Sequence, residues 1–285
     1  MRLKSFGKTV LNSIYESVRS SPISTVLEVL GLNKILSQLY WDIVYHLSSN
    51  ERSYSIQNHR ASFKIGNRNE FKRFDDDLVG ERNLISDLLE SLHNGDVFYD
   101  IGANVGTYTC FVTAKLSSKT VVAFEPEPKN VNRLRENVEL NDVDAKIIEA
   151  ALSNTNGTID LALTGDESGE GKHSIATGDD TGTIEVKTAK ADTIIDEWQL
   201  PKPTVVKIDV EGAEMSVLRG MKNTLQDSCR LVYIEVHPSK LEDYGDSPEE
   251  VHSILEESGF SVTIIEERGE EYFVRGKKES NFGEE

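Results

Sequence analysis

The sequence predicts an α/β protein of the Rossmann-like type, with a doubly wound and mostly parallel sheet. Short apolar runs alternate with amphipathic helical stretches from about residue 97 onward, which is typical of parallel strands joined by right-handed crossovers. A glycine turn follows the first run, and acidic residues stand where several runs end. With 285 residues, 38% of them hydrophobic, the chain can bury one sizeable core.

The first fifty residues are predicted to form an amphipathic helical extension. Their apolar residues recur at roughly helical spacing: Val26, Leu30, Leu36, Leu39, Ile43 and Leu47. We interpret this stripe as packing on the main domain, with contact to a membrane surface or a partner enzyme as the alternative. Residues 51–77 are polar and are expected to form a linker that pairs as a short hairpin, which makes 1–77 an extension and linker. No secretory signal pattern and no apolar run of membrane-spanning length is found, so we expect a cytoplasmic protein.

The other elements are assigned to one domain, residues 78–278, followed by a charged tail over 279–285. Periodicity predicts a lead-in helix and then alternating strands and helices, over 78–93, 97–101, 106–117, 120–125, 129–141 and 145–150. A β-arm is expected around a loop or lid rich in Gly, Asp, Ser and Thr, with arm segments 158–163 and 184–188 and the loop at 164–183. A helix, two strands, a further helix and an antiparallel pair complete the domain, over 192–199, 205–209, 231–236, 248–258, 260–265 and 271–275.

The glycine turn predicts a cofactor site at the tip of the first strand. A dinucleotide fingerprint uses three glycines so that the backbone can approach a pyrophosphate. Here Gly102 and Gly106 are present, Asn104 stands between them, and Asp100 precedes the turn. The Asp100 carboxylate would repel a pyrophosphate and attract an ammonium group. The turn therefore favours S-adenosylmethionine, which carries such an ammonium.

The next strands predict the rest of the cofactor pocket. Glu125 ends the second strand, where a carboxylate can accept hydrogen bonds from both ribose hydroxyls. Ala151 follows the third strand, where backbone groups would flank an adenine ring. An NAD-dependent oxidoreductase is the alternative, although Asp100 and the missing third glycine argue against it. A non-catalytic nucleoside-binding protein is a second alternative.

Four segments resemble the FkbM family of S-adenosylmethionine-dependent methyltransferases. They are Asp100–Gly106, Phe124–Pro126 with Asn137 and Asn141, Ala151–Ser153, and Lys207–Glu214. The last of these is the most specific, and the resemblance runs from about Val97 to about Ile265. It implies a class I methyltransferase fold and, most often, methylation of a hydroxyl oxygen on a sugar or a specialised metabolite.

Methyl transfer to a hydroxyl needs positioning of the acceptor and removal of its proton. We expect these tasks to fall to acids and a histidine at the carboxyl ends of the fourth and fifth strands, namely Asp209, Glu211, Glu214 and His237. Glu211 and Glu214 would share a face if a helix begins at Gly212. Lys207 would face the same side as Asp209 and pair with a carboxylate, and Glu235 is a candidate for orienting the base.

Composition restricts the partners. Forty-nine acidic against thirty-one basic residues give a formal charge of −18, which opposes binding to a nucleic-acid backbone. The acceptor is therefore expected to be a glycan or a small molecule. Cys110 and Cys229 lie in apolar contexts and are interpreted as packed thiols. No metal is required, and His173 and Ser174 in the predicted loop are read as exposed loop residues.

Overall fold

The computed structural model describes residues 13, 17, 43–46, 48–74, 78, 80–116, 120–163, 168–169, 174–175 and 182–279. Most of the predicted N-terminal helical extension and the loop residue His173 lie outside these residues. Within them, no helix is long and apolar enough to cross a membrane.

The described part of the chain contains a central seven-stranded sheet in the order β12-β13-β11-β10-β3-β4-β5. The strands are β3 Phe98–Ile101, β4 Val121–Phe124, β5 Lys146–Ile148, β10 Val205–Ile208, β11 Leu231–Val236, β12 Ser261–Arg268 and β13 Glu271–Lys277. Strands β11, β10, β3, β4 and β5 are parallel, whereas β13 is antiparallel to both β11 and β12. The predicted mostly parallel sheet with an antiparallel last strand is confirmed.

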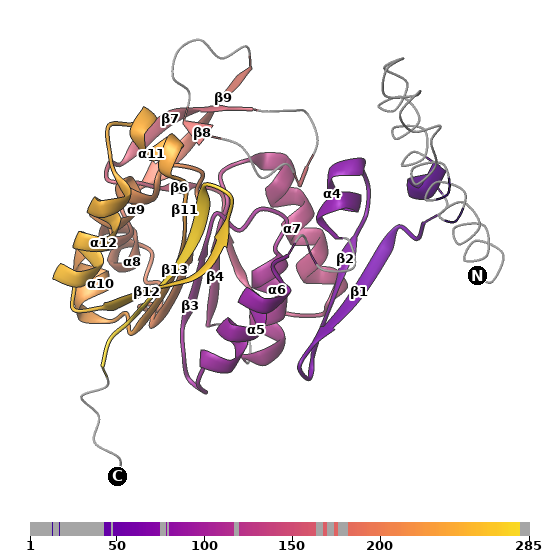
Figure 1. The fold of residues 1–285 in the computed structure, drawn as a ribbon, viewed down its shortest axis with the longest axis horizontal. Helices are drawn as coiled ribbons and strands as arrows, with labels where there is room; N and C mark the ends of the chain where they lie inside the picture. The colour runs from indigo at the N-terminus through magenta and orange to yellow at the C-terminus, as the bar shows by residue number, and fades with distance from the viewer. Residues whose placement is uncertain are drawn as a thin grey trace.

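Helices cover both faces of this sheet, as Figure 1 shows. One face carries α5 Arg82–Ser91, α6 Thr107–Lys115 and α7 Pro128–Leu140, and the other carries α8 Ala191–Glu197, α9 Glu214–Gly220, α10 Lys222–Asp227 and α12 Pro248–Glu257. Because side chains alternate along a strand, Phe98 belongs to the core under α5 to α7, and its neighbour Tyr99 belongs to the opposite core. Both cysteines are buried free thiols, as expected.

The predicted linker pairs as a short hairpin, as expected, and this hairpin packs on α6 and α7. It consists of β1 Glu51–Ile56 and β2 His59–Lys64, followed by α4 Arg68–Arg73. The side chain of Asn137 accepts a hydrogen bond from the backbone of Lys64 at 2.9 Å, and that of Asn141 exchanges two hydrogen bonds with the backbone of Ser62. These two asparagines of the family pattern therefore hold the hairpin against α7.

A second sheet forms the predicted β-arm. Its strands are β6 Ala151–Leu152, β7 Gly157–Ala162, β8 Ser174–Ile175 and β9 Thr183–Ala189, in the order β6-β9-β7-β8. The antiparallel pairing of β7 with β9 confirms the predicted hairpin. The arm borders the main pocket, because Ile159 and Leu161 of β7 are among the pocket-lining residues.

Two helix boundaries differ from the prediction. Helix α5 begins at Arg82 rather than at residue 78, because Leu78 and Gly80 adopt positive φ values of 54° and 81°. Helix α9 begins at Glu214 rather than at Gly212, because Glu211 and Gly212 have φ values of 53° and 103°. Backbone in this left-handed region cannot continue a right-handed helix, so both chain segments are turns.

Candidate active site

A cavity of about 780 Å³, open to solvent, lies at the carboxyl ends of β3, β4 and β10. The described residues that line it include Ile101, Gly102, Asn104, Phe124, Glu125, Pro126, Asn130, Ala150, Ala151, Leu152, Ser153, Ile159, Leu161, Asp209, Val210, Glu211 and Ala213. This is the edge at which ligands bind in open α/β sheets. Four of the six predicted cofactor residues therefore line one pocket, namely Gly102, Asn104, Glu125 and Ala151.

The turn between β3 and α6 requires glycine at both of its ends. Gly102 has a φ of 74°, and a Cβ atom there would lie 1.8 Å from the carbonyl oxygen of Asp209. Gly106 has a φ of 88°, and its Cβ would lie 2.3 Å from Cδ1 of Leu134. Only glycine adopts these angles without strain while leaving room for its neighbours. Gly106 thus shapes the turn from outside the cavity, since it is not among the residues that line it.

Glu125 presents its carboxylate at the floor of the cavity. Its Oε2 atom accepts a hydrogen bond from the backbone N–H of Asn104 at 2.7 Å, and its Oε1 atom accepts one from the N–H of Glu127 at 3.0 Å. Burial raises the pKa of Glu125 to about 7, against the lowering effect of these hydrogen bonds. A carboxylate has about four acceptor sites, and Asn130 also donates to Oε1 at 3.4 Å, so the remaining capacity for hydroxyl donors lies on Oε2.

Asp100 lies behind the cavity rather than in its wall. It is fully buried, its Oδ2 accepts a hydrogen bond from Thr109 at 2.6 Å, and its Oδ1 lies 3.4 Å from Nζ of Lys207. The same ammonium lies 3.4 Å from Asp209 and donates to the carbonyl oxygen of Gly102 at 2.9 Å. Lys207 therefore neutralises two strand-end acids and ties the glycine turn to β10, which confirms its predicted pairing with a carboxylate.

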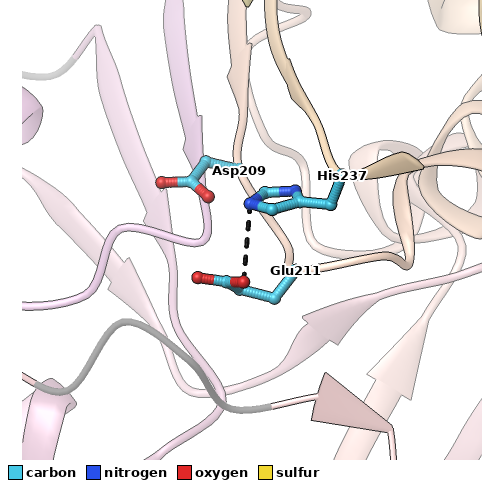
Figure 2. A group of neighbouring side chains, drawn as sticks. All are labelled: Asp209, Glu211 and His237. Carbon is cyan, nitrogen blue, oxygen red and sulfur yellow. Dashed lines mark ion pairs between the residues drawn. The ribbon is translucent and has the colours of Figure 1, made fainter. Parts of the chain in front are cut away.

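The predicted catalytic residues gather around His237, which follows β11. Nδ1 of His237 lies 2.7 Å from Oε1 of Glu214, and Nε2 lies 3.4 Å from Oε2 of Glu211. Figure 2 shows Nε2 directed toward the side chains of Asp209 and Glu211. Asp209 and Glu211 line the cavity, whereas Glu214 and His237 are buried beside it. The four residues thus form one cluster next to the cavity.

Charge interactions shift the titration of this cluster. Burial alone would lower the pKa of His237, but the hydrogen bond to Glu214 and the nearby acids raise it to about 9. Burial alone would raise the pKa of Asp209, but the charges of Lys207 and His237 outweigh it and hold that pKa below its usual value. At neutral pH the cluster therefore holds an ionised Asp209 and a protonated histidine.

One ligand atom each from Asp209, Glu211 and His237 lies within 4.8 Å of the others, a spacing that a divalent cation can bridge. However, Lys240 contacts the Glu211 carboxylate and Lys207 contacts that of Asp209. Because both carboxylates already face an ammonium, we assign no metal to this cluster.

Sequence reasoning missed several polar groups beside the cluster. Tyr108, on α6, is buried, and Glu81, directly before α5, has a side chain that is 15% exposed. Both lie within electrostatic reach of Asp209. Glu235, which the sequence analysis did single out, lies in the same group, and burial raises its pKa to about 8. No signal in the sequence marks Glu81, because it lies far from every recognised motif and reaches the cluster only through the packing of α5. Asn130, which lines the cavity and donates to Glu125 at 3.4 Å, was also missed.

The fold and the cavity define a Rossmann-like protein with a pocket at the carboxyl ends of its parallel strands. The methyltransferase FkbM domain matches residues 100–262 of this chain. The chain therefore belongs to the FkbM family of methyltransferases, and the alternatives of an oxidoreductase and of a non-catalytic binding protein are set aside.

Named relatives agree with this assignment. The chain is 33% identical over 226 residues to the hexuronic acid methyltransferase AglP of Haloferax volcanii, covering 79% of this chain and 88% of that protein. It is 29% identical over 199 residues to the 31-O-demethyl-FK506 methyltransferase FkbM of Streptomyces tacrolimicus, covering 60% of this chain and 75% of the relative. A solved FkbM methyltransferase from Methylobacillus flagellatus aligns with a TM-score of 0.44 and 15% identity, over 66% of this chain and 45% of that one. The fold assignment rests on the strand order above and not on this alignment.

Proposed function

We propose that the chain transfers the methyl group of S-adenosylmethionine to a hydroxyl oxygen of a glycan or a small metabolite, with His237 accepting the hydroxyl proton. The observation that carries this proposal is the 2.7 Å contact between His237 and Glu214, which directs the opposite ring nitrogen toward Asp209 and Glu211 at the cavity. Relatives of the chain support the acceptor class, since they include a hexuronic acid methyltransferase and a 2-O-methyltransferase.

The residues of the cavity fit the methyl donor. S-adenosylmethionine, when bound, supplies an electrophilic methyl group. Glu125 would hold the ribose hydroxyls with its remaining acceptor sites, and the backbone around Ala151 would flank the adenine. Asp209, ionised and at the cavity wall, would face the donor's ammonium in place of the buried Asp100. The glycine turn would let the backbone approach the donor closely.

Proton removal sets the chemical role of the histidine cluster. A general base must be within hydrogen-bond reach of the hydroxyl and must be unprotonated. The Glu214 carboxylate holds the ring in one orientation, so Nε2 is the atom available to the acceptor. Because the pKa of His237 is raised to about 9, the basic form becomes abundant only in mildly alkaline solution.

The test is a product assay with S-adenosylmethionine and a panel of glycosides and hydroxylated metabolites, read by the mass gain of one methyl group. Mild alkaline hydrolysis then separates the products, because a methyl ester is cleaved and a methyl ether survives. We expect an alkali-stable product that is lost in His237→Asn and retained in His252→Asn, a histidine of α12 outside the cavity-lining residues. Alkali-labile methylation, or full activity in His237→Asn, would contradict the proposal.

A further inference from the structure

A group of polar side chains lies beside the histidine cluster, where the proposed mechanism assigns no role. Strand order places β11, β13 and β12 on the side of β10 away from β3 and β4. Glu235 of β11, Arg268 at the end of β12 and Glu271 at the start of β13 therefore lie along the edge that continues from Asp209. Ligand atoms of Glu235, His237 and Glu271 come within 4.8 Å of one another.

The opposite wall of this group comes from the segment before the first parallel strand. Arg73 of α4 approaches Glu81 to 3.7 Å between Nη1 and Oε1. Gly80 faces Arg268, since a Cβ atom at Gly80 would lie 3.7 Å from Nη2 of that arginine. The charges of Asp209, Lys207 and Arg268 all act on the pKa of Glu81. Four residues therefore lie together beside Asp209 and His237, namely Arg73, Glu81, Arg268 and Glu271. All four are outside the family match at residues 100–262.

Arg268 is the member of this group with unused donor capacity. Its Nε donates to Glu266 at 2.6 Å, and its guanidinium packs 4.8 Å from the centre of the Phe273 ring. These two contacts fix the plane of the guanidinium. Its Nη2 atom is buried and has no hydrogen-bond partner among the described residues. Leaving a charged donor unsatisfied is costly, so a ligand acceptor at this position would be favoured.

The neighbouring acids do not prevent an anion from binding there. Glu235 and Glu81 both have raised pKa values because of burial, Glu235 to about 8. A raised pKa favours the uncharged carboxyl group, which can donate hydrogen bonds. The other charges around the group are the anions Asp209, Glu266 and Glu271 and the cations Lys207, Arg73 and Arg268. These three cations offset the three anions, so the group is far less acidic than the chain as a whole, whose formal charge is −18.

We propose that Glu81, Glu235 and Arg268 form the acceptor subsite, in which Arg268 pairs with a carboxylate of an acidic sugar and the two glutamic acids bind its hydroxyl groups. This assignment rests on the proposed function, and it makes the methylated acceptor a uronic acid rather than a neutral sugar. A planar guanidinium suits this task because it can engage both oxygens of a carboxylate. The specificity of the enzyme then resides outside the donor-binding segment.

The test compares p-nitrophenyl β-D-glucuronide with p-nitrophenyl β-D-glucoside, which differ only in the acceptor carboxylate. We expect kcat/KM to be about tenfold or more higher for the glucuronide, as for a lost hydrogen bond to a charged group. Arg268→Gln should remove this preference by lowering kcat/KM for the glucuronide alone, and Arg268→Lys should restore part of it. Arg275→Gln is the matched control, because Arg275 lies on the neighbouring strand β13 and pairs with Asp87 of α5 at 2.8 Å.

Calorimetry with the glucuronide and S-adenosylhomocysteine gives a second readout that does not need turnover. Binding of the glucuronide should weaken about tenfold in Arg268→Gln, while binding of S-adenosylhomocysteine stays unchanged. Equal turnover of both glycosides, or equal losses for both in Arg268→Gln, would overturn the subsite and leave the proposed function standing. Failure to methylate any hydroxylated acceptor despite normal donor binding would contradict the proposed function itself, and the subsite with it.

Discussion

The carboxylate of Glu214 lies 2.7 Å from Nδ1 of His237, and both side chains are almost completely buried. A buried carboxylate beside a histidine stabilises the protonated ring and fixes its orientation. Glu214 is itself positioned by the backbone N–H of Gly212, which donates to Oε1 at 3.0 Å. The turn at Gly212 therefore positions Glu214, which in turn orients His237, the proposed base.

The rate should rise with pH as His237 loses its proton. With a pKa raised to about 9, kcat/KM is expected to increase tenfold per pH unit below that value and to level off above it. In Glu214→Gln the rise of kcat/KM should occur at lower pH, because the carboxylate that raises the pKa of His237 is gone. A pH–rate profile for both enzymes checks this. If kcat/KM rises at the same pH in the variant as in the wild type, another group titrates.

The affinity for S-adenosylmethionine should also depend on pH, through Glu125. Ribose hydroxyls donate to the ionised carboxylate, so binding favours the form that exists above the pKa of about 7. Affinity should therefore fall as pH drops from 8 to 6, and proton release on binding should be detectable in buffers of different ionisation enthalpy. Glu125→Gln should bind more weakly and without this dependence. Unaltered pH dependence in that variant would remove Glu125 from the ribose site.

Lys207 should contribute strongly to stability, because it lies between two strand-end acids. Its side chain is 5% exposed and faces Asp100 and Asp209, each at 3.4 Å. Removing one partner of a buried ion pair costs roughly 3–5 kcal/mol, so Lys207→Met is expected to lower the free energy of unfolding by that amount. Urea denaturation measures it. Lys187→Met, on the arm strand β9, is the control and should have little effect; a loss below about 1 kcal/mol at Lys207 would contradict this assignment.

Gly102 should not tolerate a side chain. In Gly102→Ala the new Cβ would lie 1.8 Å from the carbonyl oxygen of Asp209 at a φ of 74°, so β3 and β10 must separate and donor binding should be lost. Gly95→Ala is the matched control, since its φ is 92° but nothing lies within 4 Å of the added carbon. We expect only about 1 kcal/mol of destabilisation there. Comparable unfolding curves for the two variants would refute the close approach.

Local patterns allowed the sheet and most of the residues of the cavity at its edge to be predicted. Strand-turn-helix periodicity located Gly102, and the acids at strand ends located Glu125 and Asp209, because parallel strands bring their carboxyl ends to one edge. The same reasoning placed Asp100 in the pocket, although Lys207 covers it. Which of two neighbouring strand-end acids faces the cavity depends on the twist and the side-chain pairing, which periodicity does not encode.

Of the residues in the proposed acceptor subsite, only Glu235 was singled out from the sequence, because Glu81 and Arg268 lie far from it in the chain and carry no motif. Glu81 and Arg268 come together only when α5 packs on the sheet and the β12–β13 hairpin folds beside β11. The short hairpin within residues 51–77 was predicted, but its packing against α7 through Asn137 and Asn141 was not. Tertiary packing determines both features.

Calorimetric titration of S-adenosylmethionine into the wild type, Glu125→Ala and Glu149→Ala tests directly whether the cavity binds the methyl donor through Glu125. Glu149 pairs with Arg135 at the surface and serves as the control. We expect S-adenosylmethionine to bind the wild type and Glu149→Ala with equal affinity and to lose about 1–3 kcal/mol of binding free energy in Glu125→Ala. We expect no binding of NAD. Equal affinity in all three proteins, or tighter binding of NAD, would contradict the assignment of the cavity.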